Sequence, residues 1–223
     1  MRIILYGPPG SGKGTQGDLV WKKFGYPKIS TGDLLRRAVQ DRTPLGLKAD
    51  AVMRKGLLVS DAIVLELLKE RISMPDCRTA YVLDGFPRNM SQARAIEQLE
   101  AGRPEVFLEI KVDEDTLLER LTSRRVCSQC GAIYNLATCQ GGHREFCDLC
   151  RGRLEQRPDD LPEVIKERLR VYERETENIR EFYRSRNAYH AVDGRPPAMK
   201  VFETVSAIIE RELAGPGETR VIR

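Results

Sequence analysis

The stretch GPPGSGKGT near the N-terminus combines the residue types that cradle phosphate groups. Its four glycines let backbone N–H groups approach phosphate oxygens, and Lys13 would reach the terminal phosphates as a movable charge. The usual pattern, G-x-x-x-x-G-K-[ST], has a hydroxyl directly after the lysine, whereas here Gly14 follows and the hydroxyl comes at Thr15. We therefore expect Thr15 to touch a phosphate, and Mg²⁺ to be held mainly by the phosphates and water. The alternative is a strand-to-helix turn that merely uses glycines.

Two cysteine pairs have the spacing of a metal site. Each pair reads C-x2-C, and sixteen residues separate them. The four residues are Cys127, Cys130, Cys147 and Cys150. Each pair can chelate from a tight turn, and four thiolates complete the tetrahedral shell of a structural zinc ion. Two disulfides are the alternative. Cys139 and His143 lie between the pairs and could substitute as ligands.

Several arginines lie in the sequence at positions from which they could bind phosphate groups. Arg88 follows the segment LDGFP, Arg124 precedes the cysteine block, and Arg157 and Arg168 follow it. A lobe closing over a polyphosphate with such residues at its hinges would surround the transferring group with positive charge, which is the main requirement of phosphoryl transfer. Other arginines are interpreted as charges on helix faces: Arg120, Arg125, Arg170 and Arg174. Neither histidine, His143 or His190, is placed as a general base, so we expect no dedicated base.

The composition is that of a water-soluble globular chain. Hydrophobic residues make 41% and charged residues 31% of 223 positions, and the net charge of +4 is too small to indicate a nucleic-acid or membrane partner. The chain has no apolar run of the length of a membrane span, and its N-terminal apolar stretch is too short for a signal peptide. We expect a cytoplasmic protein, in which cysteines are more often metal ligands or buried thiols such as Cys77 than disulfides.

Apolar patterns predict strands alternating with helices. Strands are expected at 2–6, 80–84, 106–112 and 190–192, and helices at 15–24, 34–54, 60–72, 113–125, 198–213 and in a long amphipathic segment after the cysteines. The stripe of that segment is Ile165, Leu169, Tyr172, Thr176, Ile179 and Tyr183. Such alternation predicts an α/β fold with a parallel sheet covered by helices on both faces. The loops at Gly7, Gly85 and Gly194 each follow a strand and should converge at its carboxyl edge.

With these features in view, the chain resembles the adenylate kinase family over nearly its whole length. The segments GPPGSGKGTQ, STGDLLR, YVLDGFPRNMSQ, RRVC and RPDDLPEVIKERL come in the family's order and spacing, and GKGT is the family's form of the loop. The resemblance implies a P-loop core at 1–29, 60–125 and 164–214, an AMP-binding lobe at 30–59, a zinc lid at 126–163 and a tail at 215–223. Asn89 departs from the family's frequent threonine, and Cys139 and His143 are additional residues in the lid.

The resemblance also implies transfer of the terminal phosphate of MgATP to AMP, giving two ADP, by a monomer without nucleic-acid or membrane partners. ATP would be bound by Gly10, Ser11, Gly12, Lys13, Gly14, Thr15, Arg124, Ile133, Tyr134 and Pro196. AMP would be bound by Thr31, Arg36, Leu57, Leu58, Val59, Gly85, Phe86, Pro87, Arg88, Gln92, Arg157 and Arg168. The catalytic set would be Lys13, Arg88, Arg124, Arg157, Arg168, Asp159 and Asp160. Asp84 and Asp33 would organise water around Mg²⁺, and the four paired cysteines would hold Zn²⁺.

Three alternatives stay open. A relative could act on UMP, CMP or GMP, or use GTP as donor, although pyrimidine-specific relatives usually have a short lid. A zinc-ribbon protein that binds nucleic acid would need a basic, aromatic-rich ribbon, whereas SQCGAIYNLATCQGGHREFCDLC has one arginine and no lysine. A catalytically silent regulator would keep the fold, but every phosphate-facing position is intact.

Overall fold

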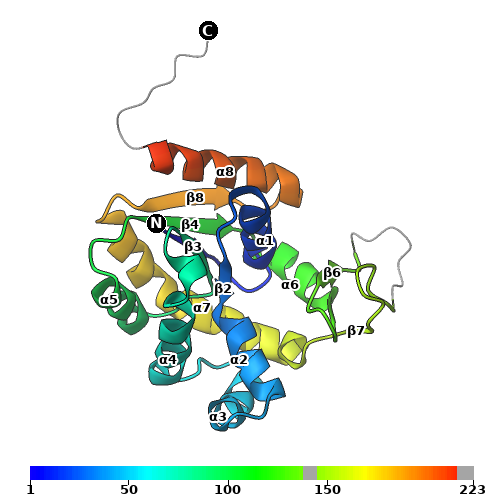
Figure 1. Cartoon of the computed structure of the whole chain (residues 1–223). Coiled ribbons are helices and arrows are strands. Elements are labelled where there is room, and N and C mark those ends of the chain that lie inside the picture. Colours follow the sequence, from blue (N-terminus) through cyan, green and yellow to red (C-terminus); the bar gives the residue numbers. More distant parts are fainter. Residues whose placement is uncertain (138–144, 215–223) are drawn as a thin grey trace.

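A parallel β-sheet forms the centre of the protein (Figure 1). The computed structural model describes residues 1–137 and 145–214, so Cys139, His143 and the tail from residue 215 lie outside the described residues. The sheet has the order β2-β3-β1-β4-β8 and contains β1 (Arg2–Tyr6), β2 (Lys28–Ser30), β3 (Tyr81–Asp84), β4 (Glu105–Lys111) and β8 (Tyr189–Asp193). All its strand pairs are parallel, which confirms the predicted α/β class.

Helices cover both faces of this sheet, because successive side chains of a strand point to opposite sides. Ile3 and Leu5 pack in a cluster with residues of α1 (Lys13–Phe24) and α8 (Ala198–Ala214). Ile4 and Tyr6 pack in a second cluster with residues of α4 (Asp61–Ile72), α5 (Met90–Leu99) and α7 (Pro162–Arg184). These two clusters fix the direction in which each strand enters its carboxyl-end loop.

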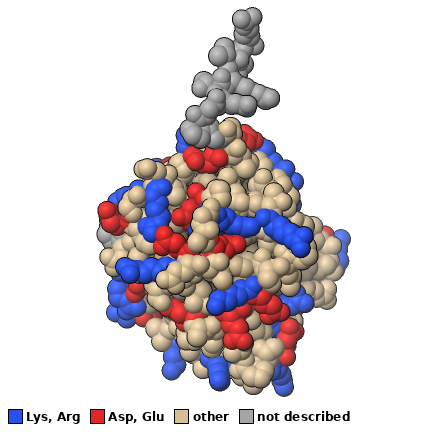
Figure 2. All heavy atoms as spheres, turned by 60° about the vertical axis from the view of Figure 1, so that its left-hand side comes forward, with Lys and Arg blue, Asp and Glu red and all other residues tan. Residues whose placement is uncertain are grey.

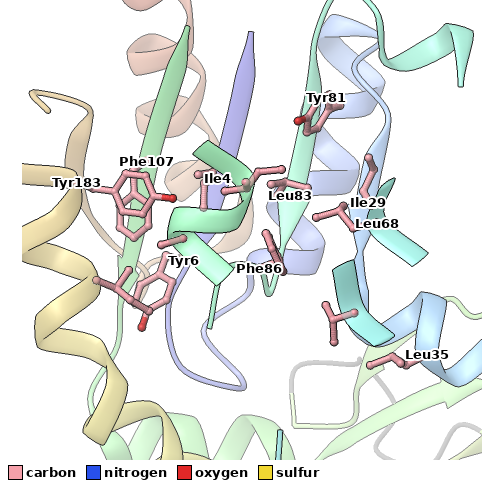
Figure 3. Close-up of a cluster of buried hydrophobic side chains, with 14 of the residues drawn as sticks. Ile4, Tyr6, Ile29, Leu35, Leu68, Tyr81, Leu83, Phe86, Phe107 and Tyr183 are labelled. Atoms are coloured by element: carbon pink, nitrogen blue, oxygen red, sulfur yellow. The ribbon is translucent and has the colours of Figure 1, made fainter. Parts of the chain in front are cut away.

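Aromatic rings fill the second cluster near the start of the glycine loop (Figure 3). The ring of Phe107 lies 5.1 Å from that of Tyr6 and 4.1 Å from that of Tyr183, measured between centroids. Tyr183 ends the predicted stripe of α7, whose members Ile165, Thr176, Ile179 and Tyr183 are all at most 4% exposed. The helix is therefore anchored to β4 and β1, from which the phosphate loop departs.

Two smaller lobes extend from the core. The first contains α2 (Thr31–Gln40) and α3 (Pro44–Met53), which replace the single helical region expected at 34–54. Thr43 caps α3 by accepting the Gly46 N–H at 3.0 Å, and Pro44 starts that helix. The second lobe is a small antiparallel sheet, β6-β5-β7, made of β5 (Arg124–Cys127), β6 (Ile133–Asn135) and β7 (Leu154–Glu155). It projects beside α6 (Glu114–Thr122) in Figure 1.

Some local predictions were wrong. The helix expected over 113–125 ends at Thr122, because Arg124 and Arg125 pair with Asn135 and Tyr134 as strand residues. The helix expected over 60–72 begins at Asp61, and the side chain of Ser60 before it makes no capping hydrogen bond. The short turns at Pro75–Cys77 and Pro158–Asp160 and the strand β2 were not expected. Within the described residues, no helix has both the length and the apolar character needed to span a membrane.

Candidate functional site

One cavity of about 820 Å³ lies at the carboxyl edge of the parallel sheet. The loops after β1, β3 and β8 all line it, at Gly7, Gly85 and Gly194, so the predicted convergence is confirmed. Residues of both smaller lobes close its sides, among them Leu58 of the 30–59 segment and Asn135 of β6. The volume falls within the range of ligand pockets, and the walls come from parts of the chain that are distant in sequence.

The phosphate loop ends where α1 begins, so the N-terminus of that helix faces the cavity. Gly12 stands at the N-cap with φ of +96°, a backbone conformation that favours glycine. Lys13 Nζ donates to the carbonyl oxygens of Gly7 at 2.7 Å and Pro8 at 2.8 Å. Burial lowers the pKa of Lys13 to about 7, although the Asp84 carboxylate opposes that shift. The loop thus holds a cation of unusually low pKa beside helix N–H groups that favour anions.

Gly14, the position that carries a hydroxyl in the usual pattern, lies beside Asp84 and Ile133. A Cβ atom built there would lie 3.4 Å from Asp84 Oδ2 and 3.8 Å from Ile133 Cδ1. Both distances are ordinary van der Waals contacts, so this position directly adjoins a carboxylate from the end of β3. Burial raises the pKa of Asp84, an effect that Lys13 partly opposes. Asp84, Lys13 and the loop form one charged unit at the floor of the cavity.

Arg124 and Arg168 are joined by one buried carboxylate. Asp160 is fully buried, and both its oxygens accept from Arg124, with Nε at 2.7 Å from Oδ2. Arg168 Nη1 donates to Asp160 Oδ1 at 3.0 Å and to the Asp159 carbonyl at 2.8 Å. The two arginines line the cavity, whereas Asp160 does not and lies behind them. It acts on the cavity by holding two guanidinium groups in place.

Arg88 lies in the cavity next to this pair. Its Nε donates to the Gly85 carbonyl at 2.7 Å, and its side chain is open to solvent inside the cavity. Its depth in the protein, together with the Arg168 guanidinium, lowers the pKa of Arg88 to about 10. This structure thus concentrates cations at a point where a polyphosphate would relieve their mutual repulsion.

Further ion pairs connect the two smaller lobes across the cavity. Arg36 Nη2 lies 2.5 Å from Asp33 Oδ1, and Arg36 Nη1 lies 3.8 Å from Asp159 Oδ2. Arg157 Nη2 lies 3.8 Å from the same oxygen of Asp33, and its Nε is buried without a hydrogen-bond partner. Burial and the nearby Arg36 lower the pKa of Arg157 to about 10. Despite burial, which raises it, Arg36 and Arg157 lower the pKa of Asp33.

The remaining candidates divide between the cavity wall and the core. Thr31 Oγ1 donates to the Gly85 carbonyl at 3.0 Å. The expected residues that line the cavity besides those already described are Gly10, Ser11, Thr15, Thr31, Leu57, Leu58, Val59, Gln92, Ile133, Tyr134 and Pro196. Phe86 and Pro87 do not line it, because Phe86 is 1% exposed and packs in the core cluster. Their neighbours Gly85 and Arg88 do line the cavity.

Sequence reasoning missed Gln16 and Arg120. Gln16, 2% exposed, donates from Nε2 to the Ala198 carbonyl at 2.9 Å, and Arg120 Nη1 donates to the Gly194 carbonyl at 3.0 Å. Both line the cavity beside Pro196. The sequence feature that could have indicated Gln16 as a cavity residue is its position directly after the phosphate loop. Arg120 was interpreted as a helix-face charge, since its partner lies 74 residues away in sequence.

The four paired cysteines come together as a candidate metal centre. Their sulfur atoms all lie within 4.8 Å of one another. Backbone N–H groups point at the sulfurs, from Cys130 to Cys127 Sγ at 3.5 Å and from Leu149 to Cys147 Sγ at 3.4 Å. Four thiols at this spacing, with donors that stabilise thiolates, fit a tetrahedral zinc ion, and none of them is in a disulfide.

Tyr134 links this centre to the cavity. It lines the cavity, as expected of a residue beside a bound base, but its hydroxyl lies 3.3 Å from Cys147 Sγ. The hydroxyl also accepts the Asp148 N–H at 3.0 Å. Tyr134 therefore orients a candidate metal ligand with its hydroxyl group.

Comparison with known proteins agrees with this geometry. The family model described as adenylate kinase matches residues 5–188. A protein from Clostridium tetani named adenylate kinase is 42% identical over 212 residues, covering 94% of this chain and 98% of its own length. Proteins of the same name from Archaeoglobus fulgidus and Thermodesulfovibrio yellowstonii are 42% and 43% identical, covering 95% of this chain and 99% and 100% of their own lengths. The match thus includes the phosphate loop, both smaller lobes and the cysteine centre.

Proposed function

This chain belongs to the adenylate kinase family, and from that premise we propose which of its residues perform the family's reaction. The enzyme is a phosphotransferase that moves the terminal phosphate of ATP reversibly to AMP, giving two ADP. Mg²⁺ accompanies ATP in this family. The observation that carries our assignment is the cluster of arginines from three separate segments around one cavity with Lys13.

We assign the donor phosphates to the glycine loop. Backbone N–H groups from Gly10 to Thr15 and the N-terminus of α1 bind phosphate oxygens, and Lys13 leaves its loop carbonyls to reach the terminal phosphates. The donor base would lie between Ile133 and Tyr134 on one side and the Pro196 carbonyl on the other. Gln16 and Arg120 border this end of the cavity.

The transferred phosphoryl group would be held by arginines from both sides. Arg88, Arg124, Arg157 and Arg168 supply charge where negative charge develops, and this electrostatic stabilisation does most of the catalysis in phosphoryl transfer. Asp84 and Asp33 would orient the water ligands of Mg²⁺ bound with ATP, and that ion would supply positive charge against the phosphates. No side chain needs to act as base, because AMP attacks with a phosphate oxygen that is already ionised.

AMP would occupy the other end of the cavity, against the 30–59 lobe. Thr31, Arg36 and the 57–59 segment bound this end, and Gln92 would read the base. Residues 126–163 would act as a lid that excludes water and prevents ATP hydrolysis, a motion for which adenylate kinases are known. The ion pairs from Arg36 and Arg157 to the facing carboxylates suit such a closed contact.

The acceptor panel is the experiment that tests this assignment. ADP formation from MgATP is measured with AMP, CMP, UMP or GMP as acceptor. We expect rapid ADP formation with AMP, at twice the rate of ATP loss. Activity with another monophosphate alone would move the specificity to a related kinase, and no transfer to any acceptor would refute the function.

The cellular setting is part of the proposal. We propose a cytoplasmic location, because each cysteine that the structure describes is free of disulfides, as is usual in a reducing compartment. A monomer is proposed, because the core and both smaller lobes of one chain all contribute residues to the cavity. Figure 2 shows Lys and Arg interspersed with Asp and Glu over the face in view, which does not favour nucleic acid as a partner.

Lys13 should make nucleotide binding dependent on pH. Below about pH 7 the lysine is charged in the free protein, so phosphates bind it without proton uptake. Above that pH it is neutral when free, and bound phosphates raise its pKa, so binding must take up about one proton and weaken about tenfold per pH unit. Titration calorimetry at pH 8, in two buffers of different ionisation heat, measures this uptake. Lys13→Gln serves as control and should abolish it; buffer-independent heat in the wild type would contradict the prediction.

A zinc ion held by the four paired cysteines would stabilise a lobe that has almost no hydrophobic core of its own. The apolar cluster there contains little beyond the cysteines, Leu154 and Tyr134, while Leu149 is 78% exposed. Metal removal is therefore expected to lower the thermal unfolding midpoint by about 10 °C, because metal binding supplies folding energy, while the core stays folded at 25 °C. Circular dichroism before and after chelation measures both effects.

Two variants accompany this experiment. Cys130→Ser should lose the metal and show the lower midpoint without chelator, whereas Cys77→Ala, which removes a buried thiol of the core, should keep the full metal content. An unchanged melting curve after verified metal loss would show that the centre does not stabilise the lobe.

A further inference from the structure

The side-chain amide of Gln92 is held at both ends. Gln92 is 2% exposed, lies in the first turn of α5 and lines the cavity. Its Oε1 accepts the Arg88 backbone N–H at 2.8 Å, and its Nε2 donates to Asp61 Oδ1 at 2.7 Å. A backbone N–H only donates and a carboxylate only accepts, so these two partners select one orientation of the amide.

Asp61 is itself held in place. Asn89 Nδ2 donates to the same Asp61 oxygen at 3.0 Å, and Asn89 Oδ1 accepts the Gln92 backbone N–H at 2.9 Å. Asn89 thus caps α5 and fastens it to Asp61, the first residue of α4. Asp61 follows the 57–59 segment, which lines the cavity, so two walls of the AMP end meet at this carboxylate.

Turning the amide by 180° would replace both hydrogen bonds by repulsion. Oε1 would then face the carboxylate oxygen of Asp61, and the NH₂ group would face the Arg88 N–H. The Arg88 N–H and the Asp61 carboxylate would then lose their hydrogen-bond partner. Leaving a buried polar group without a partner costs more free energy than a typical hydrogen bond contributes to stability. Gln92 therefore presents a fixed order of acceptor and donor to the cavity.

Each end of this amide keeps one further hydrogen-bonding position, an acceptor on Oε1 and a donor on Nε2. A 6-aminopurine offers an exocyclic N–H donor and a ring nitrogen acceptor. A 6-oxopurine has an oxygen acceptor in place of the exocyclic N–H donor, and an N–H donor in place of the ring nitrogen acceptor. Reading the two bases in the same place requires opposite orientations of the amide.

We propose that Asp61 is a positioning residue for acceptor specificity, which locks Gln92 so that the pocket takes a 6-aminopurine monophosphate and rejects a 6-oxopurine one. The proposal rests on the proposed function, because AMP as acceptor sets the direction of the preference. Asp61 acts only through Gln92, without touching the reacting atoms.

Asp61→Asn tests this role. The variant side chain can offer an N–H to Oε1 of a turned amide, so the Arg88 N–H alone still opposes that orientation, and the barrier to turning is lower than in the wild type. Initial rates are measured with AMP and with IMP, which differs at the 6-position and N1, at saturating MgATP. We expect the ratio of kcat/KM for AMP to that for IMP to fall about tenfold to a hundredfold, mostly through KM, while kcat with AMP stays within about threefold.

Glu66→Gln is the matched control, since it removes the same charge from an exposed position of the same helix and should leave the ratio unchanged. An unchanged ratio in Asp61→Asn that unfolds at the wild-type midpoint would overturn the proposal. Should that variant fail to fold, the ratio of kcat/KM for AMP to that for IMP is measured for Asp61→Ala instead. An unchanged ratio in Asp61→Ala would also overturn the proposal. Calorimetric affinities for AMP and IMP give the ratio without turnover. Wild-type protein that cannot phosphorylate AMP at all would refute the proposed function instead.

Discussion

Replacing Arg88 with alanine is expected to lower kcat about a thousandfold while the protein stays folded. Arg88 lines the cavity close enough to Lys13 and Arg168 to interact with both charges, and there it would meet the transferred phosphoryl group. Arginines in this role contribute roughly three to five orders of magnitude to kcat in related phosphoryl transfers. Its depth in the protein and a neighbouring guanidinium disfavour its charged form in the free protein, so its removal should cost little stability.

The Arg88 variant is compared with two others. Arg88→Lys keeps a charge but loses the planar fork, and we expect it to recover only part of the rate. Arg174→Ala removes an exposed arginine of α7 and should leave kcat unchanged. Steady-state kinetics with thermal unfolding curves measures all three. Near-normal turnover of Arg88→Ala would refute the role assigned to this residue.

Replacing Asp160 with alanine is expected to reduce both stability and activity. The carboxylate is fully buried and holds Arg124 and Arg168, so its loss leaves two guanidinium groups without their shared partner. Removing one partner from a buried pair typically costs about 3 kcal/mol of unfolding free energy. The same loss frees two arginines that would clamp phosphates, and kcat/KM should fall about a hundredfold.

Glu167→Gln is the matched control for Asp160. Glu167 also accepts from an arginine at two atoms, in the same helix that carries Arg168, but its partner Arg170 is 68% exposed. Pairs of this kind contribute at most about 1 kcal/mol. Chemical denaturation and initial rates measure the difference, and equal effects of both substitutions would contradict a positioning role for Asp160.

The sequence predicted the elements whose signals are local. Ile3 to Leu5 form an apolar run ended by glycine and proline, and the stripe of α7 repeats at helical spacing, so both were recognisable. Strand β2 was not, because Lys28–Ser30 has three residues of mixed character and depends on its pairing with β3. The end of α6 was misplaced since the pairing of Arg124 with Asn135 is a tertiary contact.

The site divides in the same way. Motif spacing indicated Lys13, Arg88 and the cysteines, because glycine loops and chelating pairs are continuous in sequence. The hydrogen bonds that orient these residues join distant segments, such as Arg120 to Gly194 or Gln92 to Asp61. Residue type alone gave no indication of them. Phe86 shows the opposite case, since it belongs to the motif expected at the AMP end, yet its ring packs in the core cluster.

Direct transfer between two nucleotides is the central claim, and the fate of labelled phosphate tests it most directly. The protein is incubated with ATP labelled at the terminal phosphate, Mg²⁺ and AMP, and the early products are separated. We expect nearly all label lost from ATP to appear in ADP, in the phosphate newly attached to AMP. If the label is released mainly as inorganic phosphate and AMP stays unchanged, water is the acceptor. That result would contradict direct transfer from ATP to AMP.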